Sequence, residues 1–221
     1  SVSEGHPDKV CDQVSDAILD EFLRGDPDSR VAVETITTTG FVGIVGEVTS
    51  KVSFDIEQLI RKTIAGIGYN DPNLKFDSDS CEIMIKLDTQ SADISQGVTA
   101  NENKEQGAGD QGMMFGYATK ETEELMPLPI LLAHKLTKKL ADVRKSGELS
   151  WVRPDGKSQV SVRYENDKPK QLEAIVISTQ HSPDISHEEI TEQITERVIK
   201  PVCGELWNDR IKIHVNPTGK F

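Results

Sequence analysis

The sequence predicts an α+β fold of two related modules, each ordered helix–strand–strand–helix–strand and each packing two helices on one face of a small sheet. Two observations lead to this prediction. Apolar residues recur at helical spacing in four segments, with β-branched runs of strand length between them. Both halves of the 221-residue chain carry these patterns in the same order. Such a sheet keeps a second face that packing between modules or subunits would cover.

The first half begins with a helix and a hairpin. Pro7 suits a first helical turn, because the N–H that proline lacks has no partner there. Gly40 separates two β-branched runs and predicts the turn between them. The expected elements are a helix over 7–23, strands over 31–39 and 41–49, a helix over 56–67 and a strand over 81–87.

The second half repeats this order. Pro127 lies in the first turn of its first helix, and Ser186 with Glu189 forms a capping box for the second. The expected elements are a helix over 126–143, strands over 158–164 and 172–179, a helical stripe from Ile190 to Val202, and a strand over 211–215.

Residues 88–112 lose all periodicity and are rich in Gln, Ser, Asp, Asn and Gly. A loop of this length is usually a lid or a binding loop, and a plain linker is the alternative. The domain boundaries expected are therefore an N-terminal module over 1–98, a gating loop and linker over 99–112, and a second module over 113–221.

Composition excludes several classes of protein. A net charge of −12 argues against a nucleic-acid binder but permits a nucleoside triphosphate, which local Lys, His and metal ions can hold. No apolar run reaches the ~20 residues of a membrane span, and the polar, acidic start of the chain is unlike a signal peptide. The three cysteines lack C-x-x-C spacing, which favours a reducing compartment without disulfides or structural zinc.

The most distinctive segment is Gly107-Ala108-Gly109-Asp110-Gln111-Gly112, followed by an apolar run from Met113. Its three glycines let the backbone approach a ligand closely. A carboxylate inside such a loop indicates a binding site, and a tight surface loop is the alternative.

His6, Asp8 and Lys9 surround the start of the first predicted helix, where outward N–H groups and the helix dipole favour a phosphate. His6 offers a donor to an anionic oxygen, Lys9 a charge and Asp8 a Mg²⁺ ligand. The local alternative is that Asp8 stabilises the helix terminus and His6 is a loop residue.

Two acidic residues, Glu34 and Glu47, lie inside predicted strands, where acids are disfavoured. On a covered face they would need a cation or an ammonium group as partner, and on an exposed face they need none. The sequence does not decide between these faces.

Two further segments combine turn residues with cations. Asp155-Gly156-Lys157 follows Pro154, and Pro-Asp-Gly is a strong turn signal. The functional interpretation aims Lys157 at a phosphate and uses Asp155 to accept from a base or ribose. Residues 216–221 form a similar turn with one cation, Lys220, and one aromatic, Phe221.

The remaining histidines and the tryptophans are interpreted as structural, since no histidine has a partner at metal-ligand spacing. These residues are His134, His181, His187, His214, Trp151 and Trp207. Neither a Ser-His-Asp arrangement, an H-E-x-x-H motif nor a phosphate-binding P-loop is present.

Three segments together resemble the S-adenosylmethionine synthetase (methionine adenosyltransferase) family, and the likeness runs over essentially the whole chain in the family's order. They are Ser1-Val2-Ser3-Glu4-Gly5-His6-Pro7-Asp8-Lys9, residues 107–119 and Arg153-Pro154-Asp155. The resemblance implies a transferase of one-carbon metabolism. It joins ATP and L-methionine through attack of sulfur on C5′, then hydrolyses the released tripolyphosphate to phosphate and pyrophosphate.

The resemblance also implies roles for particular residues. His6 and Lys157 would be catalytic, Asp8 would bind Mg²⁺ and Glu34 would help to hold K⁺. The implied methionine-binding residues are Glu47, Gln96 and Asp110. The implied ATP-binding residues are His6, Asp155, Gly156, Lys157, Lys220 and Phe221.

The family implies a cytoplasmic homodimer or dimer of dimers with active sites at the subunit interface, and no nucleic-acid or membrane partner. The family's third module is expected to be absent from this chain, so that the 221 residues alone would have little or no synthetase activity. The alternative function is a non-catalytic, ATP-binding or regulatory homologue.

Overall fold

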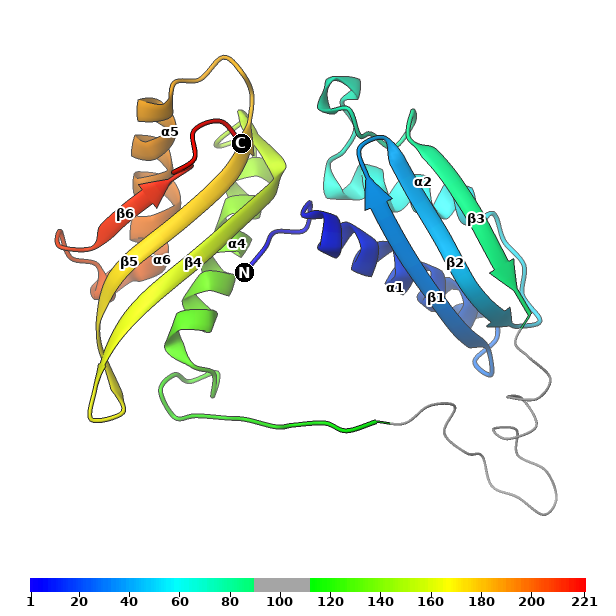
Figure 1. Cartoon of the computed structure of the whole chain (residues 1–221), viewed down its shortest axis with the longest axis horizontal. Helices are drawn as coiled ribbons and strands as arrows, with labels where there is room; N and C mark the ends of the chain where they lie inside the picture. Colours follow the sequence, from blue (N-terminus) through cyan, green and yellow to red (C-terminus); the bar gives the residue numbers. More distant parts are fainter. Residues whose placement is uncertain (90–111) are drawn as a thin grey trace. The chain divides into compact units, whose positions relative to one another are not determined.

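The computed structural model describes residues 1–89 and 112–221, which form two compact units (Figure 1). One unit, here the outer unit, consists of Ser1–Val10 together with Ala118–Phe221, and the other, the inner unit, of Cys11–Tyr117. Gln96, Asp110 and residues 107–111 of the glycine-rich segment lie outside the described residues. The outer unit thus joins both ends of the sequence.

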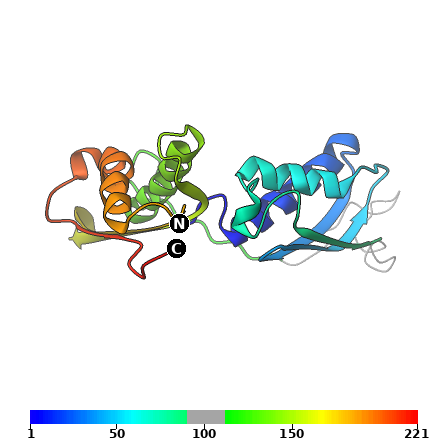
Figure 2. The ribbon, with the colours of Figure 1, turned by 90° about the horizontal axis from the view of Figure 1, so that it is seen from above.

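The inner unit is a three-stranded sheet with helices on one face (Figure 2). Strands β1 and β2 are antiparallel, and α2 crosses over so that β3 lies parallel to β2. The elements are α1 (Pro7–Gly25, whose first turn groups with the outer unit), β1 (Arg30–Thr38), β2 (Phe41–Thr49), α2 (Ile56–Ile67), the short 3₁₀ helix η1 (Pro72–Leu74) and β3 (Glu82–Asp88).

The core of the inner unit follows from the apolar stripes. Every third or fourth residue of α1 and α2 is buried against the sheet, as the helical period requires. The buried residues are Val14, Ile18 and Phe22 of α1, Ile60, Ile64 and Ile67 of α2, and Val42 and Ile44 of β2. Asp55 caps α2 by accepting from the Gln58 N–H, and Gly68 ends the helix in the left-handed conformation.

The outer unit repeats this topology. Strands β4 and β5 are antiparallel, and β6 lies parallel to β5 after a helical crossover. The elements are α4 (Leu128–Lys145), β4 (Val152–Glu165), β5 (Lys168–His181), α5 (His187–Ile194), a π-helical turn η2 (Thr195–Ile199), α6 (Lys200–Cys203), the 3₁₀ helix η3 (Gly204–Leu206) and β6 (Lys212–Val215).

The predicted α+β class and the repeated element order are confirmed. The capping box of Ser186 and Glu189 is present at α5. Two local predictions are wrong. Pro154-Asp155-Gly156 is not a turn but part of β4, where the register with β5 shifts between Val152 and Gly156. Proline is tolerated there because β4 is an edge strand of its sheet and Pro154 sits at an irregularity.

The helical stripe after Ser186 is also less regular than predicted. A π-helical turn interrupts it at Thr195–Ile199, and it resumes as α6. The interruption does not disturb burial, because Ile190, Ile194 and Val198 remain in the core of the outer unit.

Within the described part of the inner unit, no helix covers the second face of the sheet (Figure 2). Ile36 and Met84 lie on it with 55% and 42% of their surfaces exposed. Glu34 and Glu47 share this face, because Ala32, two residues before Glu34, pairs with Glu47. The face thus carries the apolar Ile36 and Met84 among charged residues that include Lys86 of β3.

The backbone of Gly46 in β2 gives a test of the inner sheet. Its φ is +143°, and a Cβ there would lie 2.0 Å from the Ala32 carbonyl oxygen. Gly46→Ala should therefore lower the free energy of unfolding by at least about 2 kcal/mol. Gly66 within α2 has no atom near its Cβ position, so Gly66→Ala should raise it by about 0.5–1 kcal/mol. Urea unfolding measures both, and equal stability of the two variants would contradict this description.

Candidate functional site

The N-terminal segment lies along the free edge of β4 as an added strand. Val2 pairs with Lys157 in an antiparallel bridge. The Ser3 N–H donates to the Gly156 carbonyl at 2.7 Å, and the Ser158 N–H donates to the Ser1 carbonyl at 2.9 Å. The Ser3 hydroxyl also donates to the Pro154 carbonyl at 2.7 Å. This pairing brings the start of α1 to the Asp155-Gly156-Lys157 segment.

Gly5 makes the closest approach between these two segments. A Cβ on Gly5 would lie 2.4 Å from the carbonyl carbon of Pro154, so no side chain fits. Gly5 directly precedes His6, and Pro154 directly precedes Asp155. The contact between Gly5 and Pro154 therefore restricts the backbone positions of His6 and Asp155.

His6 stands at the start of α1 with 17% of its side chain exposed, whereas the Asp8 carboxylate is 82% exposed. The Asp8 N–H donates to Nδ1 of His6 at 3.2 Å. In the neutral ring the proton is then on Nε2, which makes Nε2 a hydrogen-bond donor. His6 can thus offer a donor to an anionic oxygen, as the sequence suggested.

Asp155 is the unusual carboxylate of the site. Its Oδ1 is buried and has no hydrogen-bond partner among the described residues. Burial raises the pKa of Asp155, and the nearby charges of His6 and Lys157 oppose that rise. A buried acceptor without a partner is suited to a ligand that brings its own donor.

Lys157 and Phe221 face each other on the outer unit, with the Lys157 ammonium 5.4 Å from the centre of the Phe221 ring. Asn216 holds the turn that leads to Phe221. Its side chain accepts from the Thr179 N–H at 2.8 Å and donates to the Thr179 carbonyl at 3.1 Å. Asn216 is 2% exposed and has a φ of +43°.

Sequence reasoning assigned no function to Asn216 or to Glu4. Asn216 could have been found, since an Asn before a proline at a turn is a residue type that tolerates positive φ and hydrogen-bonds nearby backbone. No local signal marks Glu4. Its side chain contacts α4, which lies about 140 positions further along the chain.

The predicted site residues divide between the units. The outer unit gathers His6, Asp8, Asp155, Gly156, Lys157, Lys220 and Phe221. Glu34 and Glu47 belong to the inner unit, on its uncovered sheet face, so the structure does not by itself join them to the first group. Two of the three predicted methionine-binding residues, Gln96 and Asp110, lie outside the described residues.

Within residues 1–89 and 112–221, no three His, Cys, Asp or Glu side chains gather to hold a metal ion. Mg²⁺ is commonly held by one or two carboxylates, with water and substrate phosphates as its other ligands. The exposed Asp8 carboxylate fits that kind of site, and Glu34 offers a single exposed carboxylate to a monovalent cation.

Three of the remaining histidines make hydrogen bonds within the outer unit. Nδ1 of His134 lies 2.9 Å from the Ser1 hydroxyl. His181 and His187 contact the carbonyls of Ser182 and Val215 at 2.7 and 2.9 Å.

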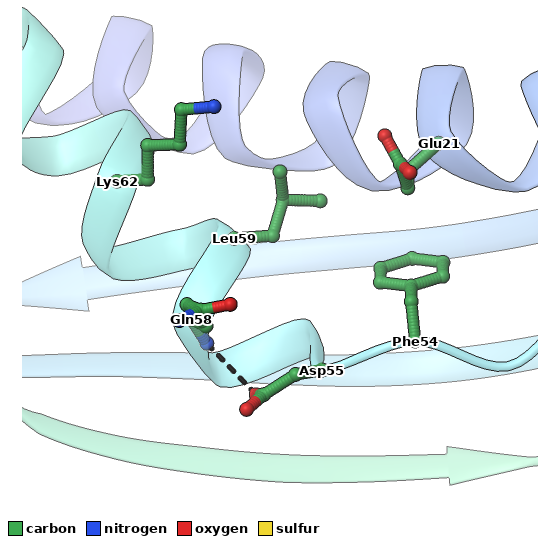
Figure 3. Close-up of a pocket in the computed structure, with 6 residues that line it drawn as sticks. All are labelled: Glu21, Phe54, Asp55, Gln58, Leu59 and Lys62. Atoms are coloured by element: carbon green, nitrogen blue, oxygen red, sulfur yellow. Dashed lines mark hydrogen bonds between the residues drawn. The ribbon is translucent and has the colours of Figure 1, made fainter.

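A groove of about 580 Å³ lies in the inner unit between α1 and α2 (Figure 3). In this view Leu59 lies between Lys62 and Glu21, and the Phe54 ring lies below Glu21. The carboxylate of Asp55 is already engaged as the cap of α2, at 2.9 Å from the Gln58 nitrogen. None of the predicted site residues lines this groove.

The fold and the site define a two-unit α+β protein whose first helix begins beside a lysine and a buried carboxylate, an arrangement suited to a phosphorylated ligand. No helix in the described part of the chain is long and apolar enough to cross a membrane.

Comparison with known proteins gives the family. Residues 1–92 match the model of the S-adenosylmethionine synthetase N-terminal domain, and residues 105–221 match its central domain. S-adenosylmethionine synthases of Sorangium cellulosum and Desulfosudis oleivorans are each 52% identical over 224 aligned positions. The alignments cover 100% of this chain but 53% and 58% of those proteins. The chain belongs to the S-adenosylmethionine synthetase family and spans about half the length of these curated relatives.

Asp155 gives a pH-dependent test of the site. Burial raises the pKa of Asp155 in the folded protein above the usual 3.8. The folded state therefore favours the protonated carboxyl group, and the free energy of unfolding decreases as the pH rises through the pKa of the folded state. Asp155→Asn should therefore raise Tm by a few degrees at about pH 7, and this gain should shrink as the pH falls toward about 4. Thermal unfolding at both pH values measures the effect.

Asp184→Asn, at an exposed position, is the matched control and should leave Tm unchanged at both pH values. A loss of stability in Asp155→Asn at neutral pH would mean that the ionised carboxylate is stabilised by His6 and Lys157 more than burial costs it.

Proposed function

We propose that this chain forms the ATP-binding and part of the methionine-binding machinery of a methionine adenosyltransferase. In the reaction, a lone pair on the methionine sulfur attacks C5′ of ATP. The bond between C5′ and the triphosphate oxygen breaks and its electrons remain on tripolyphosphate, while sulfur becomes a sulfonium. Tripolyphosphate is then hydrolysed to phosphate and pyrophosphate.

The observation that carries the proposal is the convergence of His6 with Asp155 and Lys157 through the pairing of residues 1–3 with β4. A thioether is a neutral nucleophile that needs no general base. Catalysis then depends on alignment and on stabilising the charge that develops on the leaving group. A donor from His6 and a cation from Lys157 are suited to that task.

The other ATP contacts surround Lys157. The Phe221 ring offers a stacking surface to a base, and Lys220 adds a positive charge beside it. Asp155 would accept a hydrogen bond from the base or ribose, which would supply its buried Oδ1 with a partner. Gly156 is the remaining proposed ATP contact, and it takes no side chain because a Cβ there would lie 2.6 Å from Cδ2 of Leu140 on α4.

The methionine-binding roles proposed are those of Glu47, Gln96 and Asp110. Carboxylates suit this task, because methionine carries an ammonium group and the product a sulfonium. Glu47 and Glu34 lie close together on the uncovered face of the inner sheet, so their carboxylates repel each other. A positively charged ligand group would offset this repulsion.

The metal roles proposed are Mg²⁺ at Asp8 and K⁺ at Glu34. Mg²⁺ neutralises the charge of the triphosphate when it is bound. Asp8 stands in the first turn of α1, where it follows His6, and so can present its carboxylate beside the phosphates that His6 contacts.

We also propose a cytoplasmic homodimer or dimer of dimers, with active sites shared between subunits. The uncovered inner sheet face supports self-association, because Ile36 and Met84 lie exposed on it. The acidic composition and the free cysteines of the described residues are compatible with a reducing cytoplasm.

The module organisation stays a proposal as well: modules over 1–98 and 113–221, a gating loop and linker over 99–112, and a third family module outside these residues. The length of the curated relatives is compatible with it. The 221 residues alone are expected to have little or no synthetase activity.

Lys157 tests the catalytic assignment. In the gene product that contains this sequence, Lys157→Met should lower kcat/KM by about 100-fold or more, because a cation at the leaving group is lost. The assay measures S-adenosylmethionine and phosphate formed from ATP, methionine, Mg²⁺ and K⁺. Lys168→Met, an exposed lysine at the start of β5, is the control and should retain activity.

The same assay separates the alternative function. A wild-type gene product that binds ATP but forms no S-adenosylmethionine would be a non-catalytic or regulatory homologue. Full turnover by the isolated 221-residue chain would instead refute the expected need for further residues.

The sheet face tests the assembly. Ile36→Lys places a charge on the apolar face and should shift the gene product toward monomers in analytical ultracentrifugation. Leu23 is an exposed apolar residue of α1, 38% accessible, and Leu23→Lys should leave the sedimentation unchanged. Unchanged sedimentation of Ile36→Lys would argue against this face as the interface.

A further inference from the structure

Glu4 forms a half-buried ion pair with the last turn of α4. Its Oε1 lies 2.6 Å from Nη2 of Arg144 and its Oε2 lies 2.7 Å from Nζ of Lys145. The Glu4 and Arg144 side chains are only 22% and 13% exposed. Each carboxylate oxygen thus has its own cation, an arrangement stronger than a single exposed pair.

The ion pair acts on a short turn. The His6 N–H donates to the Ser3 carbonyl at 3.1 Å, so that Glu4 and Gly5 are the two central residues of the turn. Ser3 is anchored before the turn by its bonds to Gly156 and Pro154. His6 follows the turn at once, and the orientation of the turn therefore sets the direction of the imidazole.

Both central residues of this turn contact other elements of the outer unit. The Gly5 backbone packs against Pro154 on β4, while the Glu4 side chain reaches α4. Without the ion pair, Ser1 and Ser3 would still be bonded to β4, because those bonds are between backbone groups or come from Ser3 itself. The Glu4 side chain adds a contact to α4, which those backbone bonds do not supply.

We propose that Glu4 is a positioning residue, whose ion pair with Arg144 and Lys145 fixes the turn that directs His6 toward Asp155 and Lys157. The inference rests on the proposed function in one respect, namely that His6 acts on the leaving group. Glu4 itself touches neither substrate. Its effect is on alignment, and misplacement of a reacting group by about 1 Å can cost about 100-fold in rate.

The test compares kinetic constants in the whole gene product. Glu4→Gln keeps the size of the side chain and removes its charge. It should lower kcat by about 10–100-fold while the KM values for ATP and methionine stay near wild type. Asp142→Asn breaks an exposed ion pair with Lys138 on the same helix, and as the matched control it should leave kcat unchanged.

A double-mutant cycle shows whether the effect passes through α4. Arg144→Met should reproduce the loss seen in Glu4→Gln, and the double variant should be no worse than either single variant. Glu4→Asp, which keeps the charge on a shorter chain, should restore part of kcat. If Glu4→Gln does not fold, Glu4→Asp and Arg144→Met supply the same comparison.

A second readout does not depend on turnover. In protein carrying ¹³C-labelled histidine, the His6 imidazole signals, assigned by their loss in His6→Ala, should shift in Glu4→Gln and stay in place in Asp142→Asn. Unchanged His6 signals with wild-type kcat in Glu4→Gln would overturn the proposal. If the wild-type protein is inactive, the proposed function fails, and the imidazole signals alone decide whether Glu4 positions His6.

Discussion

The backbone pairing between the first three residues and the edge of β4 is the constraint on which the site depends. It uses an edge strand that would otherwise present unpaired N–H and C=O groups. The pairing also joins two segments of the outer unit that the inner unit separates in the sequence, since Ser1 and Ser158 are 157 positions apart. This pairing brings the start of α1 to the Asp155-Gly156-Lys157 segment, and the packing of Gly5 on Pro154 and the ion pair of Glu4 add to it.

The two units show how one topology serves two purposes. Each places helices on one face of a sheet whose central strand has one antiparallel and one parallel neighbour. The uncovered face differs between them. In the outer unit Lys157 and Ser178 form a cross-strand pair on it, whereas the inner sheet exposes Ile36 and Met84 there. The same fold therefore carries different side chains on the uncovered faces of its two sheets.

Much of the fold could be predicted from local pattern, because each helix buries one stripe and the hairpins follow β-branched runs. The prediction failed at Pro154-Asp155-Gly156, where turn chemistry conflicts with tertiary pairing. These residues lie in a strand because Ser1–Ser3 and β5 flank them on both sides. Turn propensity depends only on neighbouring residues, so it does not account for pairing with Ser1–Ser3, which are about 150 positions away in the sequence.

The candidate site was predictable in part for the same reason. His6, Asp155 and Lys157 were identified from motifs, and the structure adds that they converge. Glu4 contacts Arg144, a residue remote in sequence, so no local pattern could identify it, whereas Asn216 carried the local signal of an Asn before a proline. The sequence also left open the faces of Glu34 and Glu47, which depend on which face the helices cover. Gln96 and Asp110 lie outside the described residues, and their roles remain predictions.

The order of the chain has a consequence for synthesis on the ribosome. Residues 1–3 are made before Ser158, to which Ser1 bonds and which follows 157 residues later. At roughly 5–20 residues per second, the strand waits about 8–30 s for that partner. All the described strands of the inner unit are complete by Asp88, so its sheet can form during that interval. The segment from Ser1 to Asp8 can therefore take its final place only after β4 has been synthesised, later than the inner sheet can form.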